Sequence, residues 1–438
     1  MLPNSMLGII EREFTRKAYF LMRPINNFSR SRAFTKTEAA STDLTGSWDE
    51  SMLRRNDVGS YQEASKIHAF IDNYQSKGSH VVDVDGNVLL DLCSTETVPL
   101  GHNNEVFTKN ITSNGALDGN VMNAQLDASD RTDGDFANRA SDALDSIAPQ
   151  GLPNVTFADK NNAVEQAIFA AMRERGADGN MSALGFEGSH HGNSLALTQF
   201  AHPGMSLQLG WPSVKYPENE SQEAQILESI RSAIGRKREE SCPVAAVVIE
   251  PTNYQSGYVA SDNFMRELAR LARESDAALI VDEQATGCGA SGKGFWQYSG
   301  SADYVVFGKR MQVSGYFSAE RDGSRDVGLA GSQLGLRQFA IIKDHINQRN
   351  LIEQVDRVGQ AISGSVSRAS EKSSRIKGVR TVGTSSWIDT GDYATTMELY
   401  AHMRENGVLV KLNGARGVMT KPALTLTEQQ ASPLQTAL

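Results

Sequence analysis

Cysteine, long apolar runs and excess basic charge are all scarce in this sequence of 438 residues. The three cysteines, Cys93, Cys242 and Cys288, are odd in number and widely spaced, so we expect neither a disulfide framework nor a paired-cysteine metal motif. No uninterrupted apolar run approaches about 18 residues, so we expect no membrane span. The net charge of −9 provides no basic surface for nucleic acid. These absences favour a globular protein of a reducing compartment.

The composition is that of an ordinary globular protein, with 39% hydrophobic and 22% charged residues. The length predicts two or three domains, or one large α/β domain with an appendage. The eight histidines show no H-E-x-x-H spacing, so the sequence predicts no metal site.

The first 36 residues differ from the rest in charge, since they hold seven basic residues and two acidic ones with aromatic residues between them. Such an Arg-rich, acid-poor start is typical of a mitochondrial transit peptide, which predicts a matrix location. The alternative is a basic arm that remains attached and docks on a partner. The basic residues are Arg12, Arg16, Lys17, Arg23, Arg30, Arg32 and Lys36.

Buried strands alternate with amphipathic helices through the middle of the chain. Apolar residues alternate on both sides of Asp85-Gly86-Asn87, which predicts a hairpin over 80–92. The run VAAVVIEP and two later apolar runs read as buried strands with a helix between them, which predicts a doubly wound parallel sheet. The expected strands are 244–251, 277–283 and 302–309, and the expected helices include 162–176 and 261–275, the latter with Ser261 as N-cap.

The same patterns predict a division of the chain into four parts. Residues 1–36 form the transit-like segment, and 37–100 contribute the N-terminal part of a small domain. Residues 101–335 form the large α/β domain. From about 335 the pattern changes to long helices followed by short strands, so 336–438 complete a smaller α+β domain.

Two charged residues end buried strands, Asp282 after AALIV and Lys309 after ADYVVFG. Ligands of parallel sheets bind at the carboxyl ends of the strands, where a charge is useful rather than costly. Pyridoxal-phosphate (PLP) chemistry needs such a pair, a lysine for the Schiff base and an acid for the pyridine nitrogen. The alternative is two solvated strand ends without a function.

Longer motifs occur in one order from about residue 60 to about 427, and they resemble the class III PLP aminotransferases, especially the mitochondrial 4-aminobutyrate (GABA) aminotransferases. This resemblance implies a fold-type I aminotransferase, with a large doubly wound, mostly parallel sheet domain and a smaller α+β domain. It also implies PLP as cofactor and a homodimer with active sites at the subunit interface. The motifs are VVDVDGNVLLDL, SHHGNSLA, VVIEP, ALIVDEQATGCGASGKGFW and DYVVFGKRMQVSGYF.

The resemblance assigns roles residue by residue. Lys309 matches the Schiff-base lysine, and Asp282 matches the acid on the pyridine nitrogen. His190 stands where an aromatic ring stacks on the cofactor, and Glu250 matches the glutamate of a V-E-P segment. Ser332 matches the threonine that reaches the neighbouring subunit's PLP phosphate.

Other positions depart from the family pattern. Phe157-Ala158-Asp159 replaces a Gly-Ser pair that binds the phosphate at a helix N-terminus. Asn193 replaces an arginine that grips the substrate carboxylate, and a neutral amide does not replace a charged fork. A second arginine anchor is lost in the segment VMTKP, where Lys421 is the only cation left.

Further departures concern smaller groups. Gln255 replaces a glutamate that partners the arginine, and Ala285 replaces a glutamine that bonds the PLP hydroxyl. Gln284 substitutes for that glutamine if the alignment shifts by one residue. The iron–sulfur cysteines of animal relatives have no counterparts near 156–159, so we expect no cluster.

Two functions follow from these matches and departures. Loss of the phosphate cradle and both carboxylate anchors predicts a non-catalytic scaffold or accessory subunit of a mitochondrial assembly. This subunit would form a homodimer or a hetero-assembly through the aminotransferase dimer face. Retention of Lys309 and Asp282 instead favours an active ω-aminotransferase that holds PLP by other groups and acts on an altered substrate.

Overall fold

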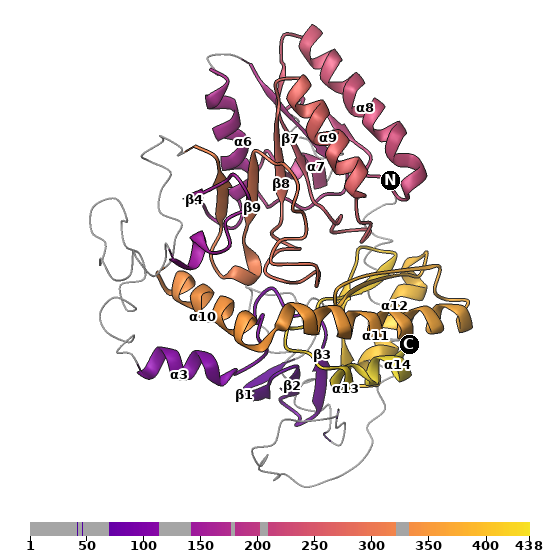
Figure 1. The fold of residues 1–438 in the computed structure, drawn as a ribbon. Coiled ribbons are helices and arrows are strands. Elements are labelled where there is room, and N and C mark those ends of the chain that lie inside the picture. The colour runs from indigo at the N-terminus through magenta and orange to yellow at the C-terminus, as the bar shows by residue number, and fades with distance from the viewer. Residues whose placement is uncertain are drawn as a thin grey trace, which may run out of the picture.

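The computed structural model describes residues 42, 46, 70–113, 142–176, 180–201, 209–320 and 333–438. The transit-like segment 1–36 and Ser332 lie outside these residues, so the expectations for both stay predictions. Figure 1 shows a large sheet with helices on both sides, and a second body that holds the C-terminus together with strands β1, β2 and β3.

The largest sheet in the described part of the chain has seven strands in the order β4-β10-β9-β8-β7-β5-β6. Strands β9, β8, β7, β5 and β6 run parallel, and β10 is antiparallel to both of its neighbours. The bounds are β4 Asn154–Phe157, β5 Ser182–Phe186, β6 Ser213–Val214, β7 Val244–Ile249, β8 Ala278–Asp282, β9 Tyr304–Phe307 and β10 Gly315–Ser318.

Strand β7 shows why this sheet is covered on both faces. Val247 and Ile249 point into a core formed with helices α8 (Glu220–Glu239) and α9 (Asp262–Glu274). Val248 points the opposite way, into a core formed with α6 (Ala163–Glu174). Successive side chains of a strand face opposite sides, so a continuous apolar run requires helices on both. The prediction of a doubly wound sheet is therefore confirmed.

Two predicted local features are also present. The Phe264 N–H donates to the Ser261 hydroxyl at 3.0 Å, which makes Ser261 the N-cap of α9 as expected. The expected hairpin is formed by β2 (His80–Asp83) and β3 (Val88–Asp91), which pair in antiparallel fashion.

The second body joins distant parts of the chain. Strand β3 pairs in parallel with β13, so the N-terminal hairpin shares a four-stranded sheet with the C-terminal region. A further sheet has the order β11-β12-β15-β14. The strands are β1 Ile71–Lys77, β11 Gly378–Val382, β12 Ser385–Asp389, β13 Val408–Leu409, β14 Lys411–Leu412 and β15 Gly417–Thr420.

Helices complete this body and link it to the large sheet. Helix α10 crosses position 335 and packs against the turn that carries Lys309. Among the described residues, we find no helix with the length and apolarity that a membrane span requires. The helices not yet given are α3 Glu105–Ser113, α7 Thr198–Ala201, α10 Gln333–Arg349, α11 Leu351–Lys372, α12 Tyr393–Glu405, α13 Glu428–Ala431 and α14 Pro433–Ala437, together with the 3-10 turn η2 Lys309–Met311.

Candidate active site

Asp282 and Lys309 lie at the same edge of the large sheet. Strand β8 ends at Asp282, and the neighbouring parallel strand β9 ends two residues before Lys309. Lys309 opens the turn η2 with a left-handed backbone, φ 50°, which a non-glycine residue rarely adopts. Such strain is typical of functional positions. The sheet therefore brings the two predicted cofactor residues to one edge.

The Asp282 carboxylate is bound from two sides. His191 Nδ1 lies 2.8 Å from Asp282 Oδ2, and the Gln284 N–H donates to Oδ1 at 3.0 Å. Burial alone would raise the pKa of Asp282, but the contacts with His191, the Gln284 N–H and Lys309 together outweigh it, and the pKa lies below its usual value. Burial would likewise lower the pKa of His191, but Asp282 raises it above the ordinary value. This edge therefore carries a buried, hydrogen-bonded Asp282–His191 pair.

His190 was assigned a role from the sequence, whereas the adjacent His191 was not. His190 is half-buried, and its ring centroid lies 5.3 Å from that of Tyr254. Burial lowers the pKa of His190, which favours its neutral form. The useful signal was the repeated histidine, because His191 binds Asp282 at the sheet edge while His190 lies beside Tyr254.

Glu96 is a second residue that was not predicted from the sequence, and its carboxylate contacts two lysines. Its Oε1 atom is 3.6 Å from Lys309 Nζ and 3.5 Å from Lys421 Nζ. Burial would raise the pKa of Glu96, but the charge of Lys309 and of the nearby cations lowers it to about 2. Burial, in turn, lowers the pKa of Lys421 well below its usual value, against the pull of Glu96. Glu96 therefore remains ionised as the counter-ion of Lys309.

Tyr254 is a third residue that was not predicted from the sequence, and it lines the pocket next to Lys421. The amines of Lys421 and Lys309 lie 3.6 Å and 4.6 Å from its ring centroid. Lys411 Nζ donates to its hydroxyl at 2.9 Å. Cations over an aromatic face are attracted by its quadrupole. Three lysines therefore hold one tyrosine ring.

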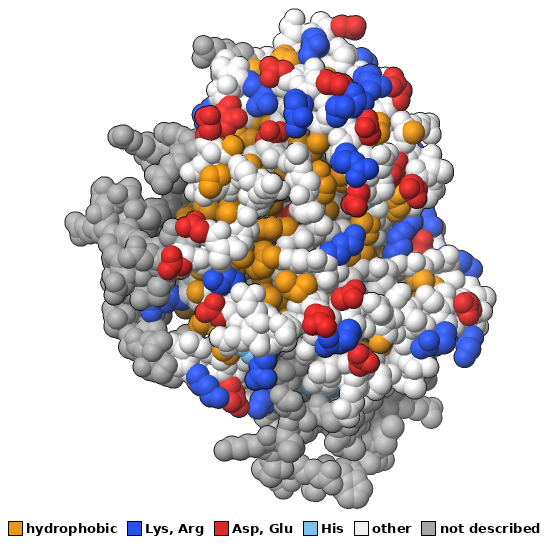
Figure 2. Space-filling view, viewed as in Figure 1, with side chains coloured by type: hydrophobic (Ala, Val, Ile, Leu, Met, Phe, Trp, Pro, Cys, Tyr) orange, Lys and Arg blue, Asp and Glu red, His pale blue; other side chains and the backbone are white. Residues whose placement is uncertain are grey.

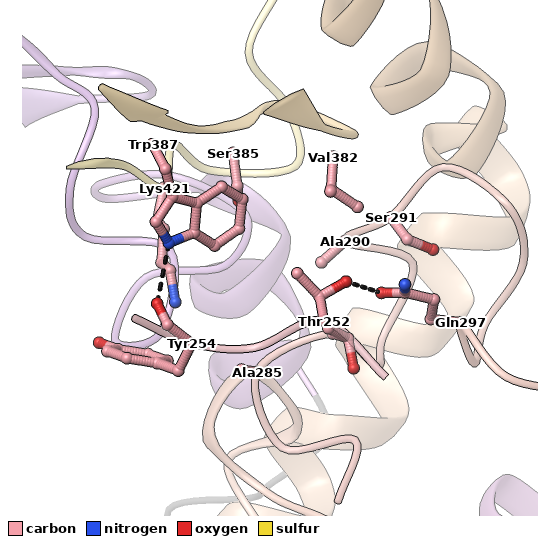
Figure 3. A pocket seen from close by; sticks show the side chains of 11 residues that line it. Thr252, Tyr254, Ala285, Ala290, Ser291, Gln297, Val382, Ser385, Trp387 and Lys421 are labelled. Atoms are coloured by element: carbon pink, nitrogen blue, oxygen red, sulfur yellow. Dashed lines mark hydrogen bonds between the residues drawn. The ribbon is translucent and has the colours of Figure 1, made fainter. Parts of the chain in front are cut away.

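Figure 3 shows the pocket beside this ring, with Tyr254 and Lys421 on one side and Thr252 and Gln297 on the other. Trp387 donates its indole N–H to the backbone oxygen of Tyr254 at 2.8 Å, and the Thr252 hydroxyl donates to Gln297 at 2.8 Å. The pocket is thus walled by both bodies of the fold, because Trp387 belongs to β12.

The structure places the other predicted site residues as follows. Glu250 is buried directly after β7, and its carboxylate accepts the Tyr254 N–H at 3.2 Å. Gln284 is buried, with its amide oxygen near Gly308. Gln255 and Asn193 are both exposed. Of this set, Glu250 and Gln284 therefore lie within the buried site.

The turn from β4 into α6 carries the predicted phosphate position. Asp159 accepts the backbone N–H of Asn161 at 2.9 Å, and the Asn193 N–H donates to the Asn161 oxygen at 3.3 Å. The side-chain oxygen of Asn162, the residue before α6, is buried without a hydrogen-bond partner. A helix start binds anions through free N–H groups. Here the Asp159 carboxylate takes a backbone N–H of the turn that leads into the helix.

These contacts decide whether PLP fits the residues present. Asp282 suits a pyridine nitrogen. However, Tyr254 lies beside the His190 ring and over the Lys309 amine, and Asp159 places a negative charge at the phosphate position. We conclude that the described conformation does not fit the cofactor. The three cysteines are free, and no cluster of metal-ligating side chains occurs among the described residues.

Comparisons with known proteins agree with this architecture. The family model described as aminotransferase class-III matches residues 61–438. The mitochondrial 4-aminobutyrate aminotransferase of Mus musculus is 26% identical over 443 residues, which cover 89% of this chain and 88% of that protein. A probable mitochondrial 4-aminobutyrate aminotransferase of Caenorhabditis elegans is 28% identical over 64% of this chain and 67% of its own.

A solved structure also shares the fold. The lysine aminotransferase from M. tuberculosis in its internal aldimine form superposes with a TM-score of 0.77 at 22% identity, over 89% of this chain and 97% of that one. The family match, the sheet order and the placement of Asp282 and Lys309 agree. The chain belongs to the class III aminotransferases.

Proposed function

We propose that this protein is a non-catalytic member of the class III aminotransferases that serves as a scaffold or accessory subunit of a mitochondrial assembly. The observation that carries the proposal is the Asp159 carboxylate at the start of α6, which takes the Asn161 N–H. A carboxylate there repels a phosphate dianion and occupies a backbone donor of the same turn. Weak cofactor retention affects turnover of every substrate.

The substrate side supports the same proposal. Asn193 is exposed and neutral, and Met419 is buried in β15, so neither offers a charge to a carboxylate. Lys421 is buried, which lowers the pKa of its amine well below the usual value, and Glu96 already lies 3.5 Å from that amine. A charge-assisted fork is about twice as strong as a neutral hydrogen bond. The two anchors predicted to be lost are therefore not replaced by these side chains.

Assembly through the family's dimer face, as a homodimer or with a different partner, is part of the proposal. Figure 2 shows hydrophobic side chains gathered across the middle of one face, whereas charged side chains gather over α8 and α9. An exposed apolar patch of this kind marks an interaction surface. Analytical ultracentrifugation tests this assembly. A protein that remains monomeric at micromolar concentration, and that also binds no other protein through this face, would contradict it.

Mitochondrial matrix location is likewise proposed. It rests on the basic, acid-poor segment 1–36 and on the similarity to the mitochondrial enzymes of mouse and nematode. A reporter fused to residues 1–36 should enter mitochondria. A reporter that stays outside them would contradict this part.

One observation favours an active enzyme as the second candidate. Asp282, His191 and Lys309 remain in place, and Lys160 lies exposed on the turn before α6, where a side-chain cation could hold a phosphate. This alternative is an ω-aminotransferase whose substrate lacks the usual carboxylate. It requires the Tyr254 ring to leave the Lys309 amine.

A single-turnover assay separates the two candidates. The protein is incubated with PLP and then mixed with GABA, β-alanine or ornithine, and the cofactor spectrum is followed. We expect no conversion to the pyridoxamine form with any of these amines. The mouse 4-aminobutyrate aminotransferase serves as the positive control with GABA. Clean conversion with any amine would overturn the non-catalytic proposal.

A further inference from the structure

The backbone of Tyr254 is fixed from both bodies of the fold. Its N–H donates to the Glu250 carboxylate at 3.2 Å, and its carbonyl accepts the Trp387 indole N–H at 2.8 Å. Gly257, three residues on, has a left-handed backbone with φ 67° and lies flat against Trp387, since a Cβ there would be 2.4 Å from the indole. These contacts fix the backbone at Tyr254 and therefore the direction of its Cα–Cβ bond.

The ring of Tyr254 lies against several of the groups that were expected to hold a cofactor. Lys309 Nζ is 4.6 Å from the ring centroid, and Lys421 Nζ is 3.6 Å from it. Lys411 holds the hydroxyl at 2.9 Å, and the His190 ring lies 5.3 Å away, tilted by 37°. The ring therefore lies against both the imidazole expected to stack on a cofactor and the lysine expected to bind it.

Glu96 completes this internal arrangement. Its carboxylate lies 3.6 Å from the Lys309 amine and 3.5 Å from the Lys421 amine, on elements far apart in the sequence. A carboxylate held this close to both amines occupies a position at which an anionic group of a ligand would otherwise pair with them. The ring and the carboxylate together therefore supply both contacts, aromatic and anionic, that an external ligand would make.

We propose that Tyr254, assisted by Glu96, is an internal occupant of this site that covers the Lys309 amine and denies it to a carbonyl ligand. This inference deepens the proposed non-catalytic function and rests on it. The inference concerns access to the Lys309 amine, whereas the proposed function rests mainly on the phosphate position at Asp159. The two can therefore be tested apart with an aldehyde that lacks a phosphate.

Pyridoxal with sodium borohydride is the probe. A free lysine amine adds to the aldehyde carbon, forms a C=N bond and releases one water. Borohydride then delivers a hydride that reduces the C=N bond to a stable secondary amine. Mass spectrometry of proteolytic peptides locates and counts the label, so the readout needs neither turnover nor a phosphate site.

We expect little labelling of Lys309 in the unaltered full-length protein and at least about tenfold more in Tyr254→Ala. Tyr254→Phe keeps the ring but loses the hydrogen bond to the charged Lys411, so it should fall between the two. Tyr393→Ala, which removes an exposed tyrosine on α12, is the matched control and should match the unaltered protein. Thermal unfolding monitored by circular dichroism checks that each variant is folded.

Three results would overturn the inference. They are full labelling of Lys309 in the unaltered protein, no gain in a folded Tyr254→Ala, or a gain that persists at another residue when Lys309→Met is added. If Tyr254→Ala does not fold, Tyr254→Phe decides, and labelling equal to that of the unaltered protein counts against the inference. None of these results bears on single-turnover transamination, so the proposed function stands or falls separately.

Discussion

The Nδ1 atom of His191 lies 2.8 Å from the Oδ2 atom of Asp282, and both side chains are buried. The remaining ring nitrogen, Nε2 of His191, is buried without a hydrogen-bond partner. A buried ion pair is costly to break from one side because the partner is left as an uncompensated charge. The pair therefore has a structural value that does not depend on catalysis.

We expect His191→Leu to destabilise the protein by about 3–5 kcal/mol, since it leaves the Asp282 carboxylate buried and unpaired. Urea unfolding followed by circular dichroism measures this loss. The double variant His191→Leu with Asp282→Leu removes both charges and should lose less than the single variant. A double variant whose loss equals the sum of the two single losses would show that the pair is not coupled.

The residues at the sheet edge could be predicted because local patterns mark them. Asp282 and Lys309 each follow a buried apolar run, and parallel strands bring such ends together. His191 was within reach of the same reasoning, as the neighbour of His190 in one motif. The fold class followed from periodicity in the same way.

Tyr254 and Glu96 could not be found in this way, because long-range packing places them. The Thr95 N–H donates to the Lys421 oxygen at 3.0 Å, and the Arg310 guanidinium donates to the Thr95 hydroxyl at 3.0 Å. These contacts, which span more than two hundred positions in the chain, set Glu96 beside Lys309. Nothing in the sequence near Glu96 encodes such a partner.

The Glu96 carboxylate should make stability depend on acid. Its pKa falls from 4.5 to about 2 in the folded state, so its contribution is fully present above pH 4.5 and is lost as pH falls toward 2. A shift of this size corresponds to about 3 kcal/mol. We expect Glu96→Gln to be less stable at pH 7 and the gap from the unaltered protein to close toward pH 2. A gap that is the same at every pH in urea titrations would contradict this.

Gly257→Ala should weaken the contact between the two bodies. The new Cβ would lie 2.4 Å from Trp387, and the left-handed backbone adds strain. We expect a loss of about 1–3 kcal/mol, as for overpacked sites. Gly86→Ala is the matched control, because its φ is 86° but no atom lies within 4 Å of the added Cβ. Equal losses in urea unfolding would show that backbone strain, and not the tryptophan contact, is the cause.

The last prediction concerns the phosphate position at the start of α6. Asp159→Asn removes one negative charge beside the Asn161 N–H but keeps a side-chain oxygen that can accept the same hydrogen bond. A phosphate dianion bound there would then meet one like charge fewer. Near a protein surface, a unit charge a few ångströms away contributes on the order of 1 kcal/mol or more, which is roughly tenfold in affinity.

This prediction is best tested in the Tyr254→Ala variant, in which the Lys309 amine is expected to be accessible to an aldehyde. The quantity is the ratio of borohydride-trapped label from PLP to that from pyridoxal, because the two aldehydes differ only in the phosphate. We expect Asp159→Asn to raise this ratio about tenfold and to leave the pyridoxal label unchanged. The gain should shrink as salt is added, since the interaction is exposed to screening. Asp344→Asn, at an exposed carboxylate on α10, is the control and should not change the ratio. If Asp159→Asn also leaves the ratio unchanged at low salt, the carboxylate does not oppose phosphate, and the main support for the non-catalytic proposal is lost.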